Sequence, residues 1–454
     1  MLDKKSLLDY ANRERASFES KLRELVETPS ISAEPARASD VRRCAELGVD
    51  TIREFGGEAD LLETGGHPIV HGRFNRGKGR KTVTIYNHLD VQPASRETEP
   101  WKTDPFTFTK NGDRYYGRGT TDDKGPALSA LWGMRAAREA GVPVNVNVLW
   151  ELEEEIGSPN FESAIKKHAK KLKTDHVIVS DTIWVSRDQP ACPAGLRGLQ
   201  GFTLTLEVGE TDQHSGVTGG AARNPIGELM KLVSEMYDAQ TGEVKIKGFY
   251  DDVVKPTRKE IDDFRKSGFS VAQFKKDHLF RSIRTNHPLE VMKRIWAMPT
   301  FEVHGLIGGY TGPGIKTIIP PRAEVKISCR LVPNQEPKKI IELVRAFVKK
   351  HNSDVKVTLE NSMYPYLAPT TGPLADAVKS AMKFAFGREP VFVREGGSIG
   401  AVNSMEKVLK CPVMFLGLSL PEHGYHAPNE NYDWRQASGG MVAFAKYFEN
   451  VASL

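Results

Sequence analysis

The sequence predicts an α/β protein whose mostly parallel sheet is interrupted by a smaller α+β domain. Strand-like apolar stretches alternate with helical patterns over the first 180 residues, which is typical of a parallel sheet covered by helices on both faces. The pattern changes near Gly201, and the α/β alternation returns after about residue 361. A chain of 454 residues exceeds the roughly 250–300 residues of one hydrophobic core, so two or three domains are expected.

The first part of the chain supplies most elements of the parallel sheet. Apolar residues at helical spacing predict a helix over 4–28, and a second helix over 40–55 is expected to end at Gly56-Gly57. Pro126 in the first turn and Gly141 at the end delimit a third helix. The further elements predicted, in chain order, are a strand over 82–87, the helix over 123–141, a strand over 142–152, a helix over 160–173 and a strand over 176–180.

The middle of the chain predicts a different unit. Its elements are a strand over 201–208, a helix near 225–238, strands near 300–306 and 323–332, a helix near 337–350 and a strand over 355–360. This βαββαβ order is typical of a ferredoxin-like split-βαβ sandwich, with the polar, partly helical stretch 240–298 as an insertion within it. The α/β pattern resumes with a helix over 373–386, a strand over 412–418 and a helix near 435–450. We therefore expect one domain of residues 1–200 and 361–454, and an inserted domain of residues 201–360.

Composition narrows the classes of function. The 63 basic and 58 acidic residues leave a net charge of +5, and the one basic cluster, 166–173, is typical of a solvated helix face. No apolar stretch approaches the ~18–20 residues of a spanning helix, and the N-terminus lacks a signal-peptide core. We expect a cytoplasmic protein without a nucleic-acid or membrane partner. Its widely spaced cysteines form no CxxC pair and are expected to be buried free thiols: Cys44, Cys192, Cys329 and Cys411.

Ionisable side chains follow the predicted strands. They are His88 and Asp90 after the strand at 82–87, Glu153, Glu154 and Glu155 after 142–152, Asp181 after 176–180 and His426 after 412–418, with Asp122 and Asp123 opening the helix at 123–141. In a parallel α/β sheet, ligands bind outside the carboxyl ends of the strands. We therefore expect these residues, scattered over the chain, to converge on one edge of the sheet.

Each of these groups has a simpler interpretation when taken alone. A histidine after a strand is commonly a satisfied core or surface residue, a glutamate triplet a solvated helix start, and Asp-Asp before a helix an N-cap. Together they would place several carboxylates at one end of one sheet, where each raises the pKa of the next. Cations relieve that repulsion, and a set of imidazoles and carboxylates suits zinc or manganese.

A set of short segments occurs in a fixed order over residues 86–430. The segments read YNHLDVQP, YGRGTTDDKGP, ELEEEIGSP, VSDTIWV, GLRG, DQHSG, CRLVPNQ, REGGSIG and HAPNE. Together they resemble the signature set of the two-metal family of carnosinase, cytosolic non-specific dipeptidase and aminoacylase, and the non-specific dipeptidase branch matches best. The resemblance implies a catalytic domain of residues 1–200 and 361–454, with residues 201–360 as a lid and dimerisation domain.

The resemblance implies a ligand set for two divalent ions, with zinc as the first choice and manganese as the alternative. His88 and Asp181 would hold one ion, Glu155 and His426 the other, and Asp122 would bridge both. Such ions lower the pKa of bound water from about 15.7 to about 7, which supplies a bridging hydroxide as nucleophile.

The resemblance also assigns a general base. The sequence by itself leaves Glu151, Glu153, Glu154 and Glu155 open, and the family's Glu-Glu-x-Gly-Ser pattern selects Glu154. Asp90 would fix the tautomer and aim of the His88 ring, because a spacing of two puts both side chains on the same side of an extended segment.

Further residues are assigned to the substrate. His214 would contact the reacting carbonyl, often from the partner chain of a homodimer, and Arg330 would clamp the substrate carboxylate bidentately. The loop of Gly396, Gly397 and Ser398 would approach the C-terminal end of the substrate. Simpler alternatives are a helix-capping histidine, a surface strand arginine and a turn without a ligand.

The residue pair Asp122-Asp123 combines a feature shared with the family and one that departs from it. Family members carry a cis peptide after the bridging aspartate, so the Asp122–Asp123 bond is expected to be cis. Close relatives often have asparagine where this chain has Asp123, which adds a negative charge near the metals if the side chain points inward.

Three hypotheses for function follow. The first is a dinuclear dipeptidase that needs a free carboxylate on its peptide substrate. The second is an N-acyl-amino-acid deacylase of the deacetylase or desuccinylase type, which would share the metal core but need no acceptor for a substrate ammonium. The third is a non-catalytic binding protein on the same fold; it predicts loss of the base or the bridging residue, whereas Glu154 and Asp122 are both present.

Overall fold

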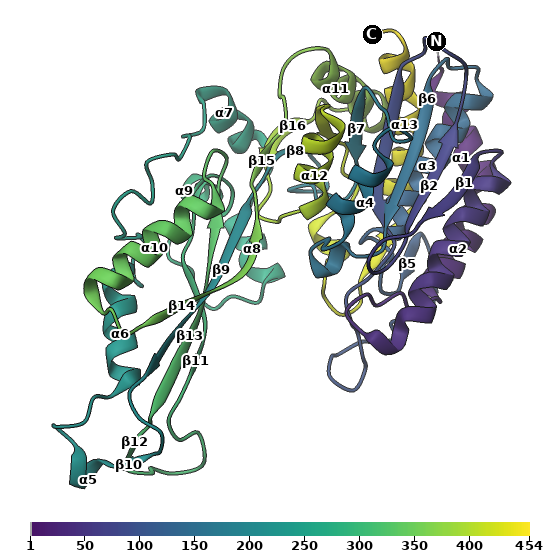
Figure 1. The fold of residues 1–454 in the computed structure, drawn as a ribbon. Helices are drawn as coiled ribbons and strands as arrows, with labels where there is room; N and C mark the ends of the chain where they lie inside the picture. Colours follow the sequence, from purple (N-terminus) through teal and green to yellow (C-terminus); the bar gives the residue numbers. More distant parts are fainter. Residues whose placement is uncertain (1) are drawn as a thin grey trace.

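A six-stranded sheet forms the centre of the larger part of the molecule (Figure 1). The computed structural model describes residues 2–454. The strand order is β1-β2-β6-β3-β7-β17; the last three pairs are parallel and the first two antiparallel, which confirms the predicted mostly parallel sheet. The strands are β1 (Glu58–Leu62), β2 (Ile69–Phe74), β3 (Thr82–His88), β6 (Asn145–Glu151), β7 (His176–Val179) and β17 (Val413–Phe415).

Helices from both ends of the chain cover this sheet, and the N- and C-terminal segments lie together (Figure 1). Asp3 and Asp433 cap the first and last of them by accepting backbone N–H groups, which stabilises a helix by about 1 kcal/mol per cap. Gly133 lets α3 approach α13 closely, because a Cβ there would lie 2.6 Å from the Met441 carbonyl oxygen. The helices are α1 (Lys4–Val26), α2 (Ala38–Glu54), α3 (Lys124–Glu139), α4 (Phe161–His168), α11 (Pro373–Phe386), α12 (Gly400–Leu409) and α13 (Trp434–Ala452).

Two small sheets and several short turns were not predicted. One sheet has the order β15-β8-β16, with β8 and β16 parallel; the other has the order β18-β5-β4. Their strands are β4 (Thr109–Asn111), β5 (Arg114–Tyr116), β8 (Ala191–Leu196), β15 (Tyr366–Leu367), β16 (Val391–Arg394) and β18 (Asn431–Asp433). The 3-10 turns are Pro35–Arg37, Glu154–Ile156 and Pro421–His423.

A four-stranded antiparallel sheet forms an arm that extends from the larger part (Figure 1). The strands lie in the order β11-β13-β9-β14 within the sheet. Along the chain, the four strands and two helices follow the predicted βαββαβ order. Helices α6 and α10 pack on the sheet over a separate hydrophobic core that includes Phe202, Leu229 and Val344. The elements are β9 (Gly198–Glu207), α6 (Pro225–Met236), β11 (Glu302–Ile307), β13 (Arg322–Leu331), α10 (Pro337–His351) and β14 (Lys356–Met363). A two-stranded antiparallel sheet of β10 (Gln213–His214) and β12 (Ile318–Ile319), with α5 (Ser215–Thr218), lies at the tip of the arm.

The helical stretch between α6 and β11 contacts the larger part. It contains α7 (Arg258–Lys266), α8 (Val271–Asp277), α9 (Pro288–Met292) and a π-turn (Lys293–Ala297). Its Phe264, Met292 and Trp296 belong to the larger hydrophobic core. Glu260 of α7 pairs with Arg394 of β16 at 2.6 Å. The domain limits 1–200, 201–360 and 361–454 stay a prediction, and this stretch joins the two cores.

Two further features bear on the sequence predictions. None of the helices in residues 2–454 is long and apolar enough to cross a membrane. The four cysteines are buried and unpaired in the structure.

Candidate metal centre

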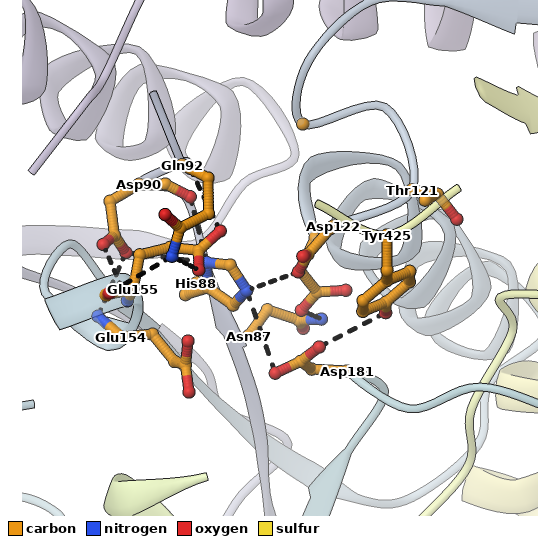
Figure 2. Close-up of polar contacts among 12 residues, drawn as sticks. Asn87, His88, Asp90, Gln92, Thr121, Asp122, Glu154, Glu155, Asp181 and Tyr425 are labelled. Carbon is orange, nitrogen blue, oxygen red and sulfur yellow. Dashed lines mark hydrogen bonds and ion pairs between the residues drawn. The ribbon is translucent and has the colours of Figure 1, made fainter. Parts of the chain in front are cut away.

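His88 ends β3 at the carboxyl edge of the sheet and is fully buried. Its Nε2 lies 3.0 Å from Oδ1 of Asp122 and 3.8 Å from Oδ2 of Asp181. Its Nδ1 lies 3.0 Å from the backbone oxygen of Asp90 and 3.5 Å from the Asp90 carboxylate. Figure 2 shows the ring between Asp90 on one side and the two acidic side chains on the other. The main chain of Asp90 is thus closer to the ring than its carboxylate is.

The Asp90 carboxylate orients a neighbouring turn. It accepts the Ser32 hydroxyl at 2.6 Å and the backbone N–H groups of Glu154 at 3.2 Å and Glu155 at 3.1 Å. These two glutamates form the 3-10 turn that follows β6. Asp90 therefore links the end of β3 to the turn that carries both glutamates, a contact that the sequence did not suggest.

Asp122 lies in the middle of the cluster. Its Oδ1 faces His88, and its Oδ2 lies 3.0 Å from Nε2 of His426. The same His426 nitrogen lies 3.1 Å from Oε2 of Glu155. The Asp122–Asp123 peptide bond is cis, as the resemblance predicted. Each oxygen of the Asp122 carboxylate thus contacts a different imidazole.

Two trios of side chains have the spacing of a metal site. The ligand atoms of His88, Glu154 and Asp181 all lie within 4.8 Å of one another, as do those of His88, Asp122 and Glu155. Residues separated by nearly 100 positions in the chain therefore meet at one edge of the sheet. The structure thus brings together the acidic and imidazole groups that the sequence predicted to converge.

A buried glutamate that sequence reasoning did not single out holds the loop before α3. The Glu430 carboxylate accepts the backbone N–H groups of Gly119, Thr121 and Asp122 at 2.9–3.0 Å. It also accepts a hydrogen bond from Nη1 of Arg118 at 2.9 Å. Glu430 belongs to the HAPNE segment, so that segment could have indicated it. Its contacts fix the backbone from which the Asp122 side chain projects.

Asp123 and Tyr425 border the cluster. The Asp123 side chain points inward, is buried, and accepts Nδ2 of Asn87 at 2.7 Å. Burial and the Asp181 carboxylate raise the pKa of Asp123 well above its usual range. The Tyr425 hydroxyl donates to Asp181 at 3.3 Å (Figure 2). The Asp123 carboxyl group therefore lies close to the cluster, and its raised pKa favours the protonated, neutral form over the negative charge considered above.

Burial and mutual repulsion raise the pKa values of several acidic groups in the cluster. Burial raises the pKa of Asp181 to about 7, and the Asp122 and Glu155 carboxylates add to this against the opposing effect of His88. Burial also raises the pKa of Glu155 and holds that of Glu154 well above its usual range. Hydrogen bonds to Asp122 and Glu155 outweigh burial and raise the pKa of His426 to about 11. Divalent cations would relieve this repulsion and compete with protons for the same atoms.

A second group of predicted residues meets at the base of the arm. Nη1 of Arg330, on β13, donates to the Ser398 hydroxyl at 3.1 Å. The Ser398 hydroxyl donates to the Arg197 carbonyl. Arg197 donates its backbone N–H to the Gly397 carbonyl at 3.0 Å and its Nε to the Gly396 carbonyl at 3.1 Å. Arg330 and the 396–398 loop are thus in contact, with Arg197 as the residue that binds them together.

Arg197 was not singled out from the sequence, although it stands in the GLRG segment. Burial and the neighbouring Arg330 guanidinium lower the pKa of Arg197 to about 10. Its Nη1 is buried and has no hydrogen-bond partner. Two half-buried guanidinium groups side by side favour an anion between them.

His214 lies apart from both groups. It ends β10 at the tip of the arm, far from β3, β6 and β7 (Figure 1), and its ring is exposed. Its Nδ1 accepts the backbone N–H of Gly216 at 3.0 Å, so within this chain it acts as a helix cap. The structure of one chain does not bring His214 to the cluster.

Fold and cluster together define an α/β protein with candidate ligands for divalent cations at the carboxyl edge of its sheet. The sequence model of Peptidase family M20/M25/M40 matches residues 84–450, more than half of the chain. The chain belongs to this family of peptidases.

Three relatives resemble the chain over almost its whole length. The Cys-Gly metallodipeptidase dug1 of Schizosaccharomyces pombe is 34% identical over 474 residues, covering 100% of this chain and 99% of the relative. The solved structure of the di-peptidase Dug1p from Saccharomyces cerevisiae has a TM-score of 0.86 at 27% identity, covering 100% of this chain and 99% of that one. The M20 family metallo-carboxypeptidase Sso-CP2 from Sulfolobus solfataricus has a TM-score of 0.86 at 32% identity, covering 95% and 98%.

Proposed function

We propose that the protein is a metal-dependent dipeptidase with a dinuclear centre. The observation that carries this proposal is the Asp122 carboxylate, which lies between the imidazoles of His88 and His426 at 3.0 Å from each. The similarity to metallodipeptidases over the full chain supports the same activity. The substrate would be a short peptide with a free carboxylate.

Two divalent cations fit the residues present, with zinc first and manganese as the alternative. Asp122 is buried, and each of its two carboxylate oxygens lies 3.0 Å from an imidazole nitrogen, Oδ1 from Nε2 of His88 and Oδ2 from Nε2 of His426, so that each oxygen could serve one of two cations. His88 and Asp181 would hold one ion and Glu155 and His426 the other, with Asp122 shared by both. When bound, the ions would supply Lewis-acid activation of water near neutral pH.

Glu154 is the proposed general base. Its backbone N–H is fixed by Asp90, and its carboxylate is among the atoms within 4.8 Å of His88 and Asp181. A carboxylate in this position would take a proton from the attacking water and deliver it to the leaving amine. Asp90 would act through its two links, one to the His88 ring and one to the Glu154 turn.

Arg330 and Ser398 are the proposed receptors of the substrate carboxylate. The Arg330 guanidinium donates to the Ser398 hydroxyl, and the 396–398 loop approaches from the larger part of the molecule. The backbone of Gly396 and Gly397 lines a cavity next to Tyr425. A bidentate guanidinium contact would fix the C-terminal end of the peptide.

A homodimer formed through the arm would complete the site, because His214 is exposed at the tip of the arm. The ring from a partner subunit would contact the reacting carbonyl. Mixing inactive His214→Ala protein with inactive Glu154→Gln protein tests this role, since a hybrid dimer contains one site with both residues intact. Recovery of activity supports the shared site, and its absence in a demonstrated hybrid dimer contradicts it.

The alternative is an N-acyl-amino-acid deacylase, which would share the metal centre. A screen of free dipeptides, tripeptides and N-acyl amino acids on metal-stripped protein, with zinc or manganese added back, separates the candidates. The tripeptides are included because one relative is a metallo-carboxypeptidase. Preference for dipeptides supports the proposal, and preference for acyl amino acids contradicts it. A cytoplasmic location is part of the proposal, and the four unpaired thiols suit a reducing compartment.

A further inference from the structure

Glu395 stands between the metal centre and the loop assigned to the substrate carboxylate. It follows β16 directly and precedes Gly396 and Gly397. Its backbone N–H donates to the Gly195 carbonyl at 2.7 Å, which fixes the start of the loop. With these glycines and Tyr425 it lines a cavity of about 740 Å³.

The Glu395 carboxylate lacks a partner for one of its oxygens. Its Oε2 is buried and makes no hydrogen bond. The other acidic residues of the cavity wall differ: Glu422 pairs with Arg187 at 2.6 Å, Asp277 accepts a hydrogen bond from Nε2 of Gln273 at 2.6 Å, and Asp188 is exposed. Among the acidic residues of this cavity wall within residues 2–454, Glu395 differs in having a buried carboxylate oxygen without a hydrogen-bond partner. Such burial is costly unless a hydrogen-bond donor or a cationic group compensates it.

The neighbouring protein charges do not supply that cation. The adjacent Arg394 directs Nε and Nη2 to Glu260 at 2.9 and 2.6 Å. Burial raises the pKa of the Glu395 carboxyl group to about 8, and the Asp181 and Asp122 carboxylates add to this rise. The site therefore favours a positive group that arrives from the cavity.

The other end of the same loop has the opposite charge. Ser398 contacts Arg330, and Arg197 beside it leaves a buried Nη1 without a partner. Ser398 is three positions after Glu395, and three residue lengths span at most about 10 Å in an extended chain. An extended dipeptide separates its ammonium and carboxylate groups by about 7 Å, or two residue lengths. One loop thus presents a negative and a positive receptor at a spacing that a dipeptide can match.

We propose that Glu395 accepts the free ammonium group of the substrate, so that the 395–398 loop recognises both ends of a dipeptide. This assignment rests on the proposed function and deepens it, because it selects zwitterionic dipeptides over N-acyl amino acids that have the same carboxylate. Arg197 is then the second guanidinium at the carboxylate end.

Two substrates that differ by one amino group test the assignment. Glycyl-L-leucine differs from N-acetyl-L-leucine by an ammonium group on the methyl carbon of the acetyl group. A site built around a polar group rejects the analogue that lacks it, so wild-type holoenzyme should prefer glycyl-leucine by at least about 100-fold in kcat/KM. Glu395→Gln should raise KM for glycyl-leucine by tenfold or more, with metal content unchanged, and leave the hydrolysis or inhibition constant of acetyl-leucine as in wild type.

Glu422→Gln is the matched control, because Glu422 lines the same cavity but is paired with Arg187. It should leave the preference between the two compounds unchanged. Equal losses on both compounds in Glu395→Gln, or no loss on glycyl-leucine, overturn the assignment. If Glu395→Gln does not fold, the wild-type comparison still decides, since equal use of both compounds also overturns it. Hydrolysis of neither compound by the metal-loaded protein instead overturns the dipeptidase proposal, and the Glu395 assignment with it.

Discussion

Replacement of Glu154 by glutamine removes the proposed base with little change in shape. The Glu154 backbone N–H stays with Asp90, because the side chain takes no part in that hydrogen bond. Glutamine cannot accept a proton from water at neutral pH. The nearby carboxylates cannot easily replace it: Asp181 is bonded to Tyr425, and Glu155 to Gln92. We therefore expect turnover to fall while the fold and the metal content persist.

The expected loss follows from the role of a positioned base. General-base catalysis contributes about 10²–10⁴-fold, which equals roughly 3–5 kcal/mol at about 1.4 kcal/mol per tenfold. Because no free carboxylate stands beside Glu154 as a substitute, we expect the upper part of that range, about 10³–10⁴ in kcat. KM should change little, since the proposed carboxylate receptors lie elsewhere, at Arg330 and Ser398.

Steady-state hydrolysis of glycyl-leucine, together with metal analysis of the same samples, measures this effect. Glu153→Gln is the control: the Glu153 carboxylate accepts the His67 backbone N–H at 2.8 Å and Nδ2 of Asn160 at 3.0 Å. This control should lose stability but keep a turnover close to wild type. Undiminished turnover in Glu154→Gln, or an equal loss in Glu153→Gln, would refute the assignment of Glu154 as the base.

Two further predictions concern the protein without metal. The pKa of Asp181 is raised to about 7, so the folded state binds more protons than the unfolded state between about pH 4 and 7. The stability of the metal-free protein should therefore fall as pH rises through that window. Asp181→Asn should reduce the fall in melting temperature between pH 5 and 7.5. The same fall in this variant as in wild type would contradict the role of Asp181. Glu430→Ala leaves Arg118 buried without its carboxylate and should cost about 3–5 kcal/mol in urea unfolding. A cost below about 1 kcal/mol would show that this ion pair does not hold the loop.

Long periodic elements were predicted well from the sequence, and short buried ones were not. Helices α1, α3 and α10 and strands β3 and β9 lie close to their predicted limits. Strand β8 was missed because Pro193 interrupts it and argues against a strand. Strand β16 has four residues, too few for a period to be visible. Such strands form because of their sheet partners, which are distant in sequence.

The residues of the candidate site also fall into those that could be predicted from the sequence and those that could not. The convergence of His88, Asp122 and Asp181 could be predicted, because the carboxyl ends of parallel strands meet at one edge. Glu430 and Arg197 form hydrogen bonds to backbone groups of loops that are distant in sequence, and a local sequence pattern does not predict such contacts. The position of His214 depends on a second chain in the proposed homodimer, which the sequence of one chain indicates by resemblance alone.

Anomalous diffraction from crystals grown with zinc or manganese measures the paired cations themselves. Two peaks should appear, one beside His88 and Asp181 and one beside Glu155 and His426, with Asp122 between them. Removal of both ions by a chelator should abolish dipeptide hydrolysis, and their return should restore it. No peak between these side chains in an active crystal, or full activity after complete metal removal, would contradict the dinuclear centre.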